Sequence, residues 1–137
     1  MSSFKIFDIA GSGMSAQSVR LNTTASNLAN AESVSGDPNQ VYKAKHPLFE
    51  AIRNGLGKDA SSSGVAVKGI FENPEAPSAR YEPGNPLADG NGYVYAPNVN
   101  TVEEMTDMIS ASRSYQNNVE VMNTAKEMMM ATLRLGS

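Results

Sequence analysis

The sequence predicts an α+β fold, with long N- and C-terminal helices paired as an α-helical coiled coil and a small β-rich insert between them. The N-terminal residues carry apolar side chains at heptad spacing, the last forty residues carry a second helical pattern, and the middle is rich in turns with short alternating stretches. We therefore divide the chain into an N-terminal helix (1–33), an insert (34–98) and a C-terminal helix (99–137).

The start of the predicted C-terminal helix is marked by capping residues. Asn100 or Thr101 can serve as the N-cap, and Glu103 or Glu104 follows at the spacing of a capping box. No glycine or proline interrupts the pattern before Gly136. Such a helix would be about 50 Å long.

Apolar residues of this helix recur in two stripes. The first, predicted to pack on the N-terminal helix, contains Met105, Ile109, Ser112, Tyr115, Val119, Met122, Lys126, Met129 and Leu133. The second begins later and contains Val121, Ala125, Met128, Thr132 and Leu135. One partner helix can cover only one stripe, so this end of the chain is expected to meet several helices, from its own fold or from neighbouring copies.

The N-terminal residues form an unbroken heptad seam. It contains Phe7, Ala10, Met14, Gln17, Leu21, Thr24, Leu28 and Ala31. We expect this seam to pair with the first C-terminal stripe. A partly exposed amphipathic helix in a small bundle would show the same spacing.

The insert is predicted to contain short strands separated by turns. The expected elements are a strand at 41–45, an apolar stretch at 47–56, a polar loop at 57–64, and strands at 65–71, 79–82 and 92–95. Because so few strands bury little surface, the insert is expected to pack against the helices or against a neighbouring molecule.

Composition excludes several classes of protein. The chain has 137 residues, a formal net charge of −3 and no cysteine, which argues against nucleic-acid binding and thiolate chemistry. No apolar run approaches the ~20 residues of a membrane span. The N-terminal segment also lacks the basic region of a cleavable secretory signal.

The motifs that suggest enzymes lack their structural context. Residues 11–16 match the dinucleotide pattern G-x-G-x-x-A, but the heptad seam runs through both glycines, and Glu32 does not end a second strand. His46 is the single histidine, with no cluster of metal ligands beside it. The segment Asp89–Gly92 fits a tight turn better than a calcium loop, because later calcium ligands are missing. We expect no catalytic residue, no cofactor and no metal site.

Several motifs resemble those of bacterial flagellar basal-body rod proteins, most closely the proximal rod type. They are Ile9–Gln17, Ala25–Asn30, Tyr42–Lys45, Tyr81–Pro86, Gly92–Val94, Pro97–Asn100 and Tyr115–Lys126. Two features depart from the family pattern: the long link from Asn30 to Tyr42, which is typical of the proximal subtype, and Asn85, where many relatives have histidine.

The resemblance implies a non-enzymatic structural subunit that assembles helically into the axial drive shaft, transmits torque and surrounds the export channel. The implied partners are copies of itself, other rod subunits, the rod–ring adaptor, the MS-ring and the flagellar type III export apparatus, without nucleic acid or membrane insertion. The implied location is the rod of the basal body, reached from the cytoplasm without a cleaved signal peptide. The alternative from another class is a soluble helical adaptor in the cytoplasm.

These inferences give a set of expected subunit-interface residues. Asn27 and Asn30, three apart on one helical face, are expected to form amide hydrogen bonds at a subunit contact. Aspartate at Leu28 or Met129 is expected to abolish assembly. The full set is Phe7, Met14, Leu21, Asn27, Leu28, Asn30, Met105, Ile109, Val119, Met122, Met128, Met129, Leu133 and Leu135.

Overall fold

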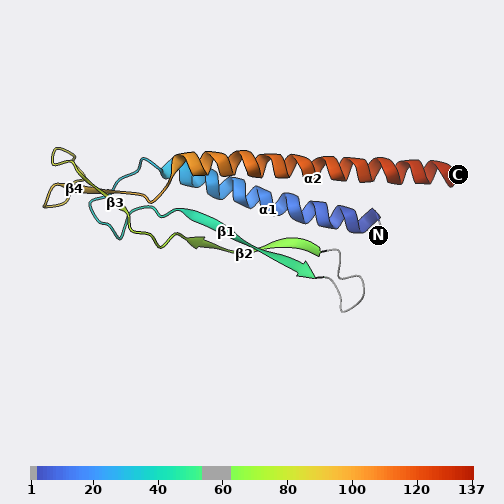
Figure 1. The fold of residues 1–137 in the computed structure, drawn as a ribbon, viewed down its shortest axis with the longest axis horizontal. Coiled ribbons are helices and arrows are strands. Elements are labelled where there is room, and N and C mark those ends of the chain that lie inside the picture. Colours follow the sequence, from blue (N-terminus) through green and yellow to red (C-terminus); the bar gives the residue numbers. More distant parts are fainter. Residues whose placement is uncertain (1–2, 54–62) are drawn as a thin grey trace.

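The computed structural model describes residues 3–53 and 63–137, with a helix near each end and four strands between them (Figure 1). The two helices confirm the predicted α+β architecture, and the predicted seam from Phe7 to Ala31 lies in α1 except for its last residue. In chain order the elements are α1 (Ser3–Asn30), β1 (Lys45–Arg53), β2 (Ser63–Glu72), β3 (Ser78–Tyr81), β4 (Tyr93–Ala96) and α2 (Thr101–Leu135).

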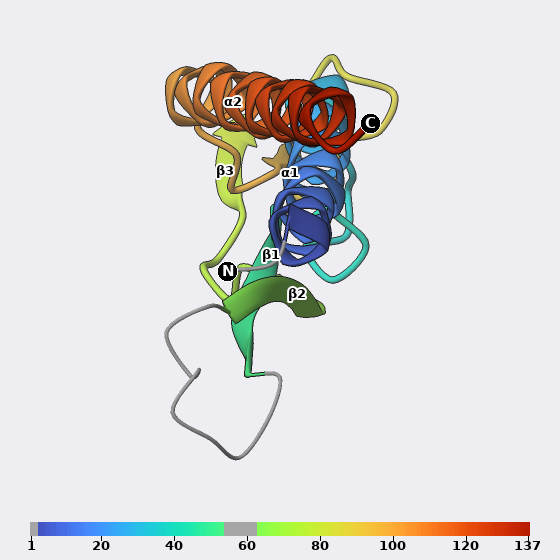
Figure 2. The same cartoon turned by 90° about the vertical axis from the view of Figure 1, so that its right-hand side faces the viewer.

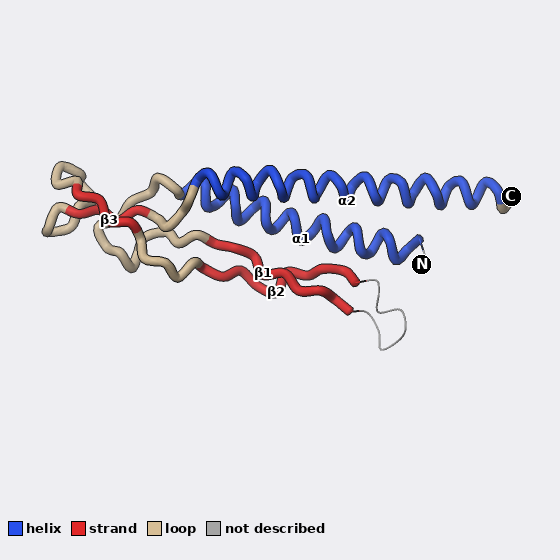
Figure 3. Tube along the Cα trace, viewed as in Figure 1, coloured by secondary structure: helices blue, strands red, loops and turns tan. Residues whose placement is uncertain are grey.

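The molecule is elongated, with α1 lying between α2 and the hairpin formed by β1 and β2 (Figures 1 and 2). The helices run antiparallel, so both termini lie at one end, and α2 extends beyond the start of α1. The β3–β4 pair lies at the opposite end (Figure 3). Because α1 is covered from two sides, its buried residues Ala10, Ala16, Thr23, Thr24 and Asn27 need not share one narrow stripe.

Asn100 caps α2, as its position in the sequence predicts. Its side-chain oxygen accepts hydrogen bonds from the backbone N–H groups of Val102, at 3.1 Å, and Glu103, at 3.3 Å. The predicted capping box does not close, because the side chain of Glu103 is exposed and that of Glu104 lies near His46. Gly136 ends the helix, and its N–H donates to the carbonyl of Thr132.

The insert contains two separate two-stranded antiparallel sheets. β1 pairs with β2 from Lys45 opposite Glu72 to Arg53 opposite Ser63, with an irregularity between Leu48 and Phe49. β3 pairs with β4. The predicted strands at 65–71, 79–82 and 92–95 are confirmed within a residue or two.

The predicted strand at 41–45 is wrong, because β1 begins only at Lys45 and contains most of the apolar stretch expected at 47–56. Val41 and Ala44 are buried on the connection before it. Their burial therefore reflects packing of an irregular segment. The predicted loop at 57–64 lies largely outside the described residues, and its last two positions, Ser63 and Gly64, begin β2.

The most buried residues of α2, where it packs against the rest of the chain, are small or polar. In α2 the buried residues are Glu104, Ala111 and Ala125, separated by multiples of seven positions. Asn118 lies at the intervening heptad position, and a Cβ added to Gly13 would come within 2.9 Å of its amide. Small residues let the helix backbones approach closely, so this seam is narrow.

This seam corrects the prediction for the first half of α2. Met105 and Ile109 were expected to pack on α1, but each is 56% exposed, and Lys126 is exposed as well. The sequence pattern followed the largest apolar residues, whereas the packed face carries Glu104 and Ala111, which have little apolar surface. Tyr115, Met122 and Met129 of the predicted stripe are half-buried.

The turn before β4 requires glycine at position 92. Gly92 has a φ of +83°, and an added Cβ would lie 2.9 Å from Cε2 of Tyr81. We expect Gly92→Ala to lower the free energy of unfolding by about 2 kcal/mol, because it adds both backbone strain and a steric clash. Urea denaturation would measure this. Gly90→Ala is the control, since a Cβ there meets nothing within 4 Å. An equal loss in both variants would contradict the explanation.

Candidate functional site

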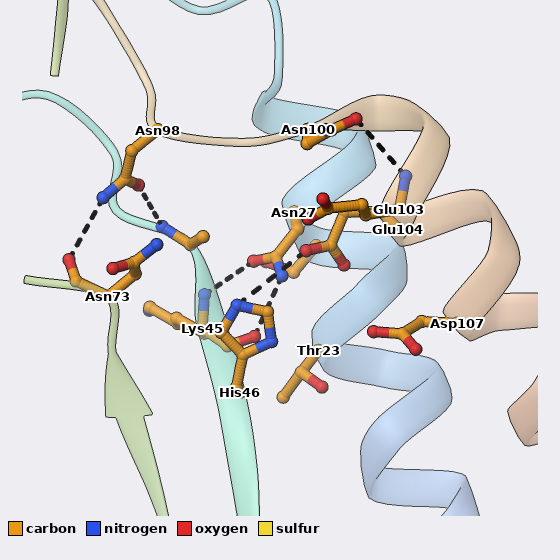
Figure 4. A network of polar contacts seen from close by, with 12 residues as sticks. Thr23, Asn27, Lys45, His46, Asn73, Asn98, Asn100, Glu103, Glu104 and Asp107 are labelled. Atoms are coloured by element: carbon orange, nitrogen blue, oxygen red, sulfur yellow. Dashed lines mark hydrogen bonds and ion pairs between the residues drawn. The ribbon is translucent and has the colours of Figure 1, made fainter. Parts of the chain in front are cut away.

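A network of hydrogen bonds around Asn27, Lys45 and Asn98 connects both helices to the β1–β2 hairpin where β1 begins (Figure 4). We call this network the joint. Asn27 is completely buried near the end of α1. Its Oδ1 accepts from the N–H of Lys45 at 2.9 Å, and its Nδ2 donates to the carbonyl of the same residue at 2.9 Å. The amide therefore pairs with the Lys45 backbone as a neighbouring strand would. The Tyr42 hydroxyl donates to the same Oδ1 at 2.8 Å.

Asn98 holds the adjacent backbone from the segment that leads into α2. Its Oδ1 accepts from the N–H of Ala44 at 3.0 Å, and its Nδ2 donates to the carbonyls of Asn73, at 3.1 Å, and Glu75, at 2.8 Å. One side chain thus links the start of β1, the segment after β2 and the approach to α2. Asn27 and Asn98 together fix two consecutive residues of the chain from two directions.

One ion pair and one contact between a histidine and a carboxylate add further links among the same elements. Nη2 of Arg20 on α1 lies 2.7 Å from Oδ1 of Asp107 on α2. Nε2 of His46 on β1 lies 4.0 Å from Oε1 of Glu104, whose side chain is 5% exposed. The second oxygen of Glu104 is buried without a hydrogen-bond partner. A carboxylate at this depth is costly unless its charge is compensated.

Large apolar side chains lie on the outside of α2. We call Val102, Met105 and Ile109 the outer face. They are 56–70% exposed and lie opposite the buried seam, because residues three to four apart share one side of a helix. Leu133 follows Met122 by three turns on the same side of α2 as the seam, and it is 68% exposed. Leu135, near the end of α2, is 89% exposed.

The structure places the expected interface residues other than Asn27 in two different environments. Those on α1 other than Asn27, together with Val119, Met122 and Met129, are half-buried between elements of the same chain. Met105, Ile109, Met128, Leu133 and Leu135 are exposed.

The structure corrects the prediction made for Asn27. Its amide oxygen and nitrogen are hydrogen-bonded inside the chain, so the expected amide contact with another subunit is wrong at this position. Asn30 is half-buried, and its Nδ2 donates to the carbonyl of Ser26, one turn earlier in the same helix.

The joint could not be recognised from the sequence. Asn98, Ala44, Lys45 and Glu104 were not singled out as its members, because hydrogen bonds between a side chain and a distant backbone leave no periodic pattern. The available signal was composition, since the segments on both sides of the insert are rich in asparagine. Asparagine can both donate to and accept from one peptide group, as Asn27 does.

Within residues 3–53 and 63–137, no three acidic, histidine or cysteine side chains lie close enough to hold a metal ion. The turn at Asp89 uses its carboxylate internally: Oδ1 accepts from the N–H groups of Asn91 and Tyr93, and Oδ2 accepts from the Tyr95 hydroxyl. Asp89–Gly92 is therefore a tight turn, as predicted.

This turn should respond to acid. Hydrogen bonding, above all from the Tyr93 N–H, lowers the pKa of Asp89 below its ordinary value of 3.8. Its contribution to stability is therefore present above about pH 5 and is lost as the pH falls through the lowered pKa. We expect Asp89→Asn to lose less stability than the wild type between pH 7 and pH 3, as measured by urea denaturation. Asp37→Asn controls for removal of one charge. Identical acid dependence in the wild type and Asp89→Asn would contradict this role.

Comparison with known proteins places these elements in a family. Residues 7–36 match the profile described as flagella basal body rod protein, and residues 91–135 match that of the flagellar basal body rod FlgEFG protein C-terminal region. The flagellar basal-body rod proteins FlgC of Salmonella typhimurium and Escherichia coli O157:H7 are 52% and 53% identical to the chain over 136 residues, covering 99% of each sequence. The FlgC protein of Aquifex aeolicus is 44% identical over 132 residues, covering 96% of each.

The chain belongs to the FlgC family of flagellar basal-body rod proteins. It is thus a structural component of the basal body rod. The two matched segments contain residues of the joint from both ends of the chain: Asn27 lies in the first segment, and Asn98 and Glu104 lie in the second. In the part of the chain that the structure describes, neither helix is long and apolar enough to cross a membrane.

Proposed function

We propose that the chain is a proximal rod subunit that packs helically with copies of itself and other rod subunits to form the shaft that transmits torque. In this arrangement α1 and α2 form the wall around the export channel, and the insert lies outside them. Residues 1–33 and 99–137 would then form the helical domain, with 34–98 as the projecting part. Its activity is mechanical, without catalysis or a bound cofactor.

One observation carries this proposal: several of the largest apolar side chains of α2 are exposed, whereas its buried apolar residues are small. Small residues such as Ala111 fill the intramolecular seam, while Met105, Ile109 and Leu133 remain outside. Exposed apolar side chains arranged along a helix are typical of interaction surfaces. A repeated contact between different faces of identical subunits produces a helical filament when it does not close into a ring.

The proposal extends to the remaining partners. The rod–ring adaptor and the MS-ring would contact the outside of the rod, and the type III export apparatus would deliver the chain from the cytoplasm without removal of a signal peptide. The exposed apolar residues of the hairpin, including Leu48, Ile70 and Phe71, support an outer contact of this kind. A soluble cytoplasmic adaptor is not favoured, because the relatives are rod proteins over nearly the whole length of the chain.

Complementation in the organism that encodes the chain tests the proposed function. Deletion of the gene should abolish swimming, and expression of the chain from a plasmid should restore it and place the chain in purified basal bodies. A deletion strain that swims normally, or a chain that remains in the cytoplasm while basal bodies form, would contradict the proposal and favour the adaptor.

A further inference from the structure

The β1–β2 hairpin is attached to α1 a second time, at Ser12, near the end of the hairpin that lies far from the joint. Oγ of Ser12 accepts a hydrogen bond from the N–H of Val65 on β2, at 3.1 Å. The same hydroxyl donates to the carbonyl of Ile9 in its own helix, at 2.7 Å. Val65 pairs with Ala51 of β1, whereas the joint holds Lys45 at the start of that strand. One hydroxyl therefore links the backbones of α1 and β2 directly.

The backbones come close together beside this hydroxyl because β2 carries a glycine there. A Cβ added to Gly64 would lie 3.0 Å from Oγ of Ser12 and 3.5 Å from its Cβ. Glycine inside a strand often marks a place where another backbone approaches closely. Gly69 of the same strand provides a contrast, since a Cβ there would meet nothing within 4 Å. The close approach is thus a property of position 64 and not of glycines in β2 generally.

The residues that matched the dinucleotide pattern have another role in the fold. Ser12 contacts β2, and the next residue, Gly13, lies against α2, where an added Cβ would come within 2.9 Å of the Asn118 amide. Successive residues of a helix point in directions about 100° apart. Two neighbouring positions therefore contact the two elements between which α1 lies (Figure 2).

Much of the hairpin has little contact with the rest of the chain. Residues 48–53 of β1 and 68–72 of β2 are exposed. Residues 63–67 of β2 are half-buried, and β2 contacts α1. Few buried side chains are available to fix the direction of the hairpin, so individual hydrogen bonds between its backbone and α1 have a large share in doing so.

Two separated attachments fix a direction as well as a position. Asn27 holds Lys45 and Ser12 holds Val65. These two side chains lie about 22 Å apart along the axis of α1, at 1.5 Å for each residue. With the joint alone, the hairpin could swing about that point, and the contact at Ser12 prevents this.

We propose that Ser12 is a positioning residue, which together with Gly64 forms a catch that holds the hairpin along α1 in the free subunit and in the assembled rod. The second half of this statement rests on the proposed function as a rod subunit. The catch keeps the exposed apolar side chains of the hairpin at a fixed place relative to both helices. A partner on the outside of the rod would then meet a surface whose position is already set.

A pair of cysteines tests the catch directly, because the chain has no cysteine of its own. Ser12→Cys combined with Gly64→Cys places two Cβ atoms about 3.5 Å apart, which suits a disulfide. We expect mild oxidation of the purified full-length chain to remove both thiols without forming a dimer. Ser12→Cys combined with Gly69→Cys is the matched control. Its second cysteine lies roughly 15 Å further along β2, so both thiols should remain.

The same pair tests the position of the hairpin in the rod. We expect the deletion strain that carries the Ser12→Cys, Gly64→Cys chain to swim, and oxidation of its purified basal bodies to join the two cysteines within one chain. Each single cysteine variant controls for the substitutions. Complementation by the wild-type chain tests the rod function separately, so the two proposals can fail independently. Free thiols in basal bodies, or a double variant that blocks swimming while both single variants swim, would overturn a hairpin that stays on α1.

Hydrogen exchange gives a measurement that needs no cysteine. Ser12→Ala removes the acceptor of the Val65 N–H, so exchange at that amide should become about fivefold faster, the effect of one lost hydrogen bond. Ser12→Thr keeps a hydroxyl and should restore most of the protection. Unchanged exchange at Val65 in Ser12→Ala, or free thiols in the oxidised, isolated Ser12→Cys, Gly64→Cys chain, would overturn the catch itself.

Discussion

Ile109→Asp should abolish rod assembly and swimming while leaving the isolated chain as stable as the wild type. The side chain is 56% exposed on the side of α2 opposite the seam, so an aspartate there remains hydrated in the free subunit. In an assembled rod the same position would be covered by a neighbour. Burial of an unpaired carboxylate costs several kcal/mol, and the cost recurs at every copy of the contact.

The measurement combines motility in soft agar, electron microscopy of purified basal bodies and urea denaturation of the isolated chain. Leu133→Asp tests the exposed apolar residues near the end of α2 and should give the same result. Ser110→Asp is the matched control, since it introduces the same charge at an exposed residue about 100° around the helix. Normal swimming of both Ile109→Asp and Leu133→Asp would show that these residues are not at the contacts.

The expected effects of aspartate at Leu28 and Met129 now have a different interpretation. Both residues are half-buried within the chain. A charge at either position would weaken the folded subunit as well as any contact between subunits. Loss of motility in those variants would therefore not distinguish folding from assembly, whereas the exposed residues separate the two.

The helices could be predicted from the sequence because their signals are local. Asn100 caps the start of α2, Gly136 caps its end, and apolar residues recur at helical spacing between them. The strands β2, β3 and β4 were also found, since each lies between clear turn residues. These features depend on neighbours within a few positions, which a single sequence contains.

The packing face of α2 could not be predicted in the same way. The periodic pattern identified Met105 and Ile109 because they are large and apolar, but a subunit with external partners places such residues outside. Glu104 and Ala111 occupy the seam instead, and neither has a strong hydrophobic signal. Hydrophobic periodicity therefore identified the apolar residues of the helix. It could not tell which of them pack inside the chain and which remain exposed and can contact another subunit.

The joint was unpredictable for another reason. Asn27 and Lys45 are 18 positions apart, and Asn98 and Ala44 are 54 apart. No local rule pairs a helix side chain with the backbone of a distant strand. The chemistry of asparagine indicates that such residues bind peptide groups, but only the fold shows which peptide group is bound.

Asn27→Ala should lower the free energy of unfolding by about 3 kcal/mol, one of the larger losses available from a single polar side chain. The change removes both hydrogen bonds to the Lys45 backbone and leaves its N–H and carbonyl without these partners in the joint. It also removes the acceptor of the Tyr42 hydroxyl. Urea denaturation would give the loss, and amide hydrogen exchange at Lys45 should increase with it.

Asn30→Ala is the matched control, because Asn30 lies one turn later in α1 and its Nδ2 binds only the carbonyl of Ser26 in its own helix. We expect that variant to lose less than about 1 kcal/mol. Asn27→Asp adds a second test: it keeps the oxygen that accepts from Lys45, loses the Nδ2 donor and brings a charge into a site with no exposed surface, so it should be at least as unstable as Asn27→Ala. Equal, small losses in all three variants would mean that the hairpin is held to α1 by packing alone. A large loss confined to position 27 would mean that one buried amide sets the register between the helical domain and the hairpin.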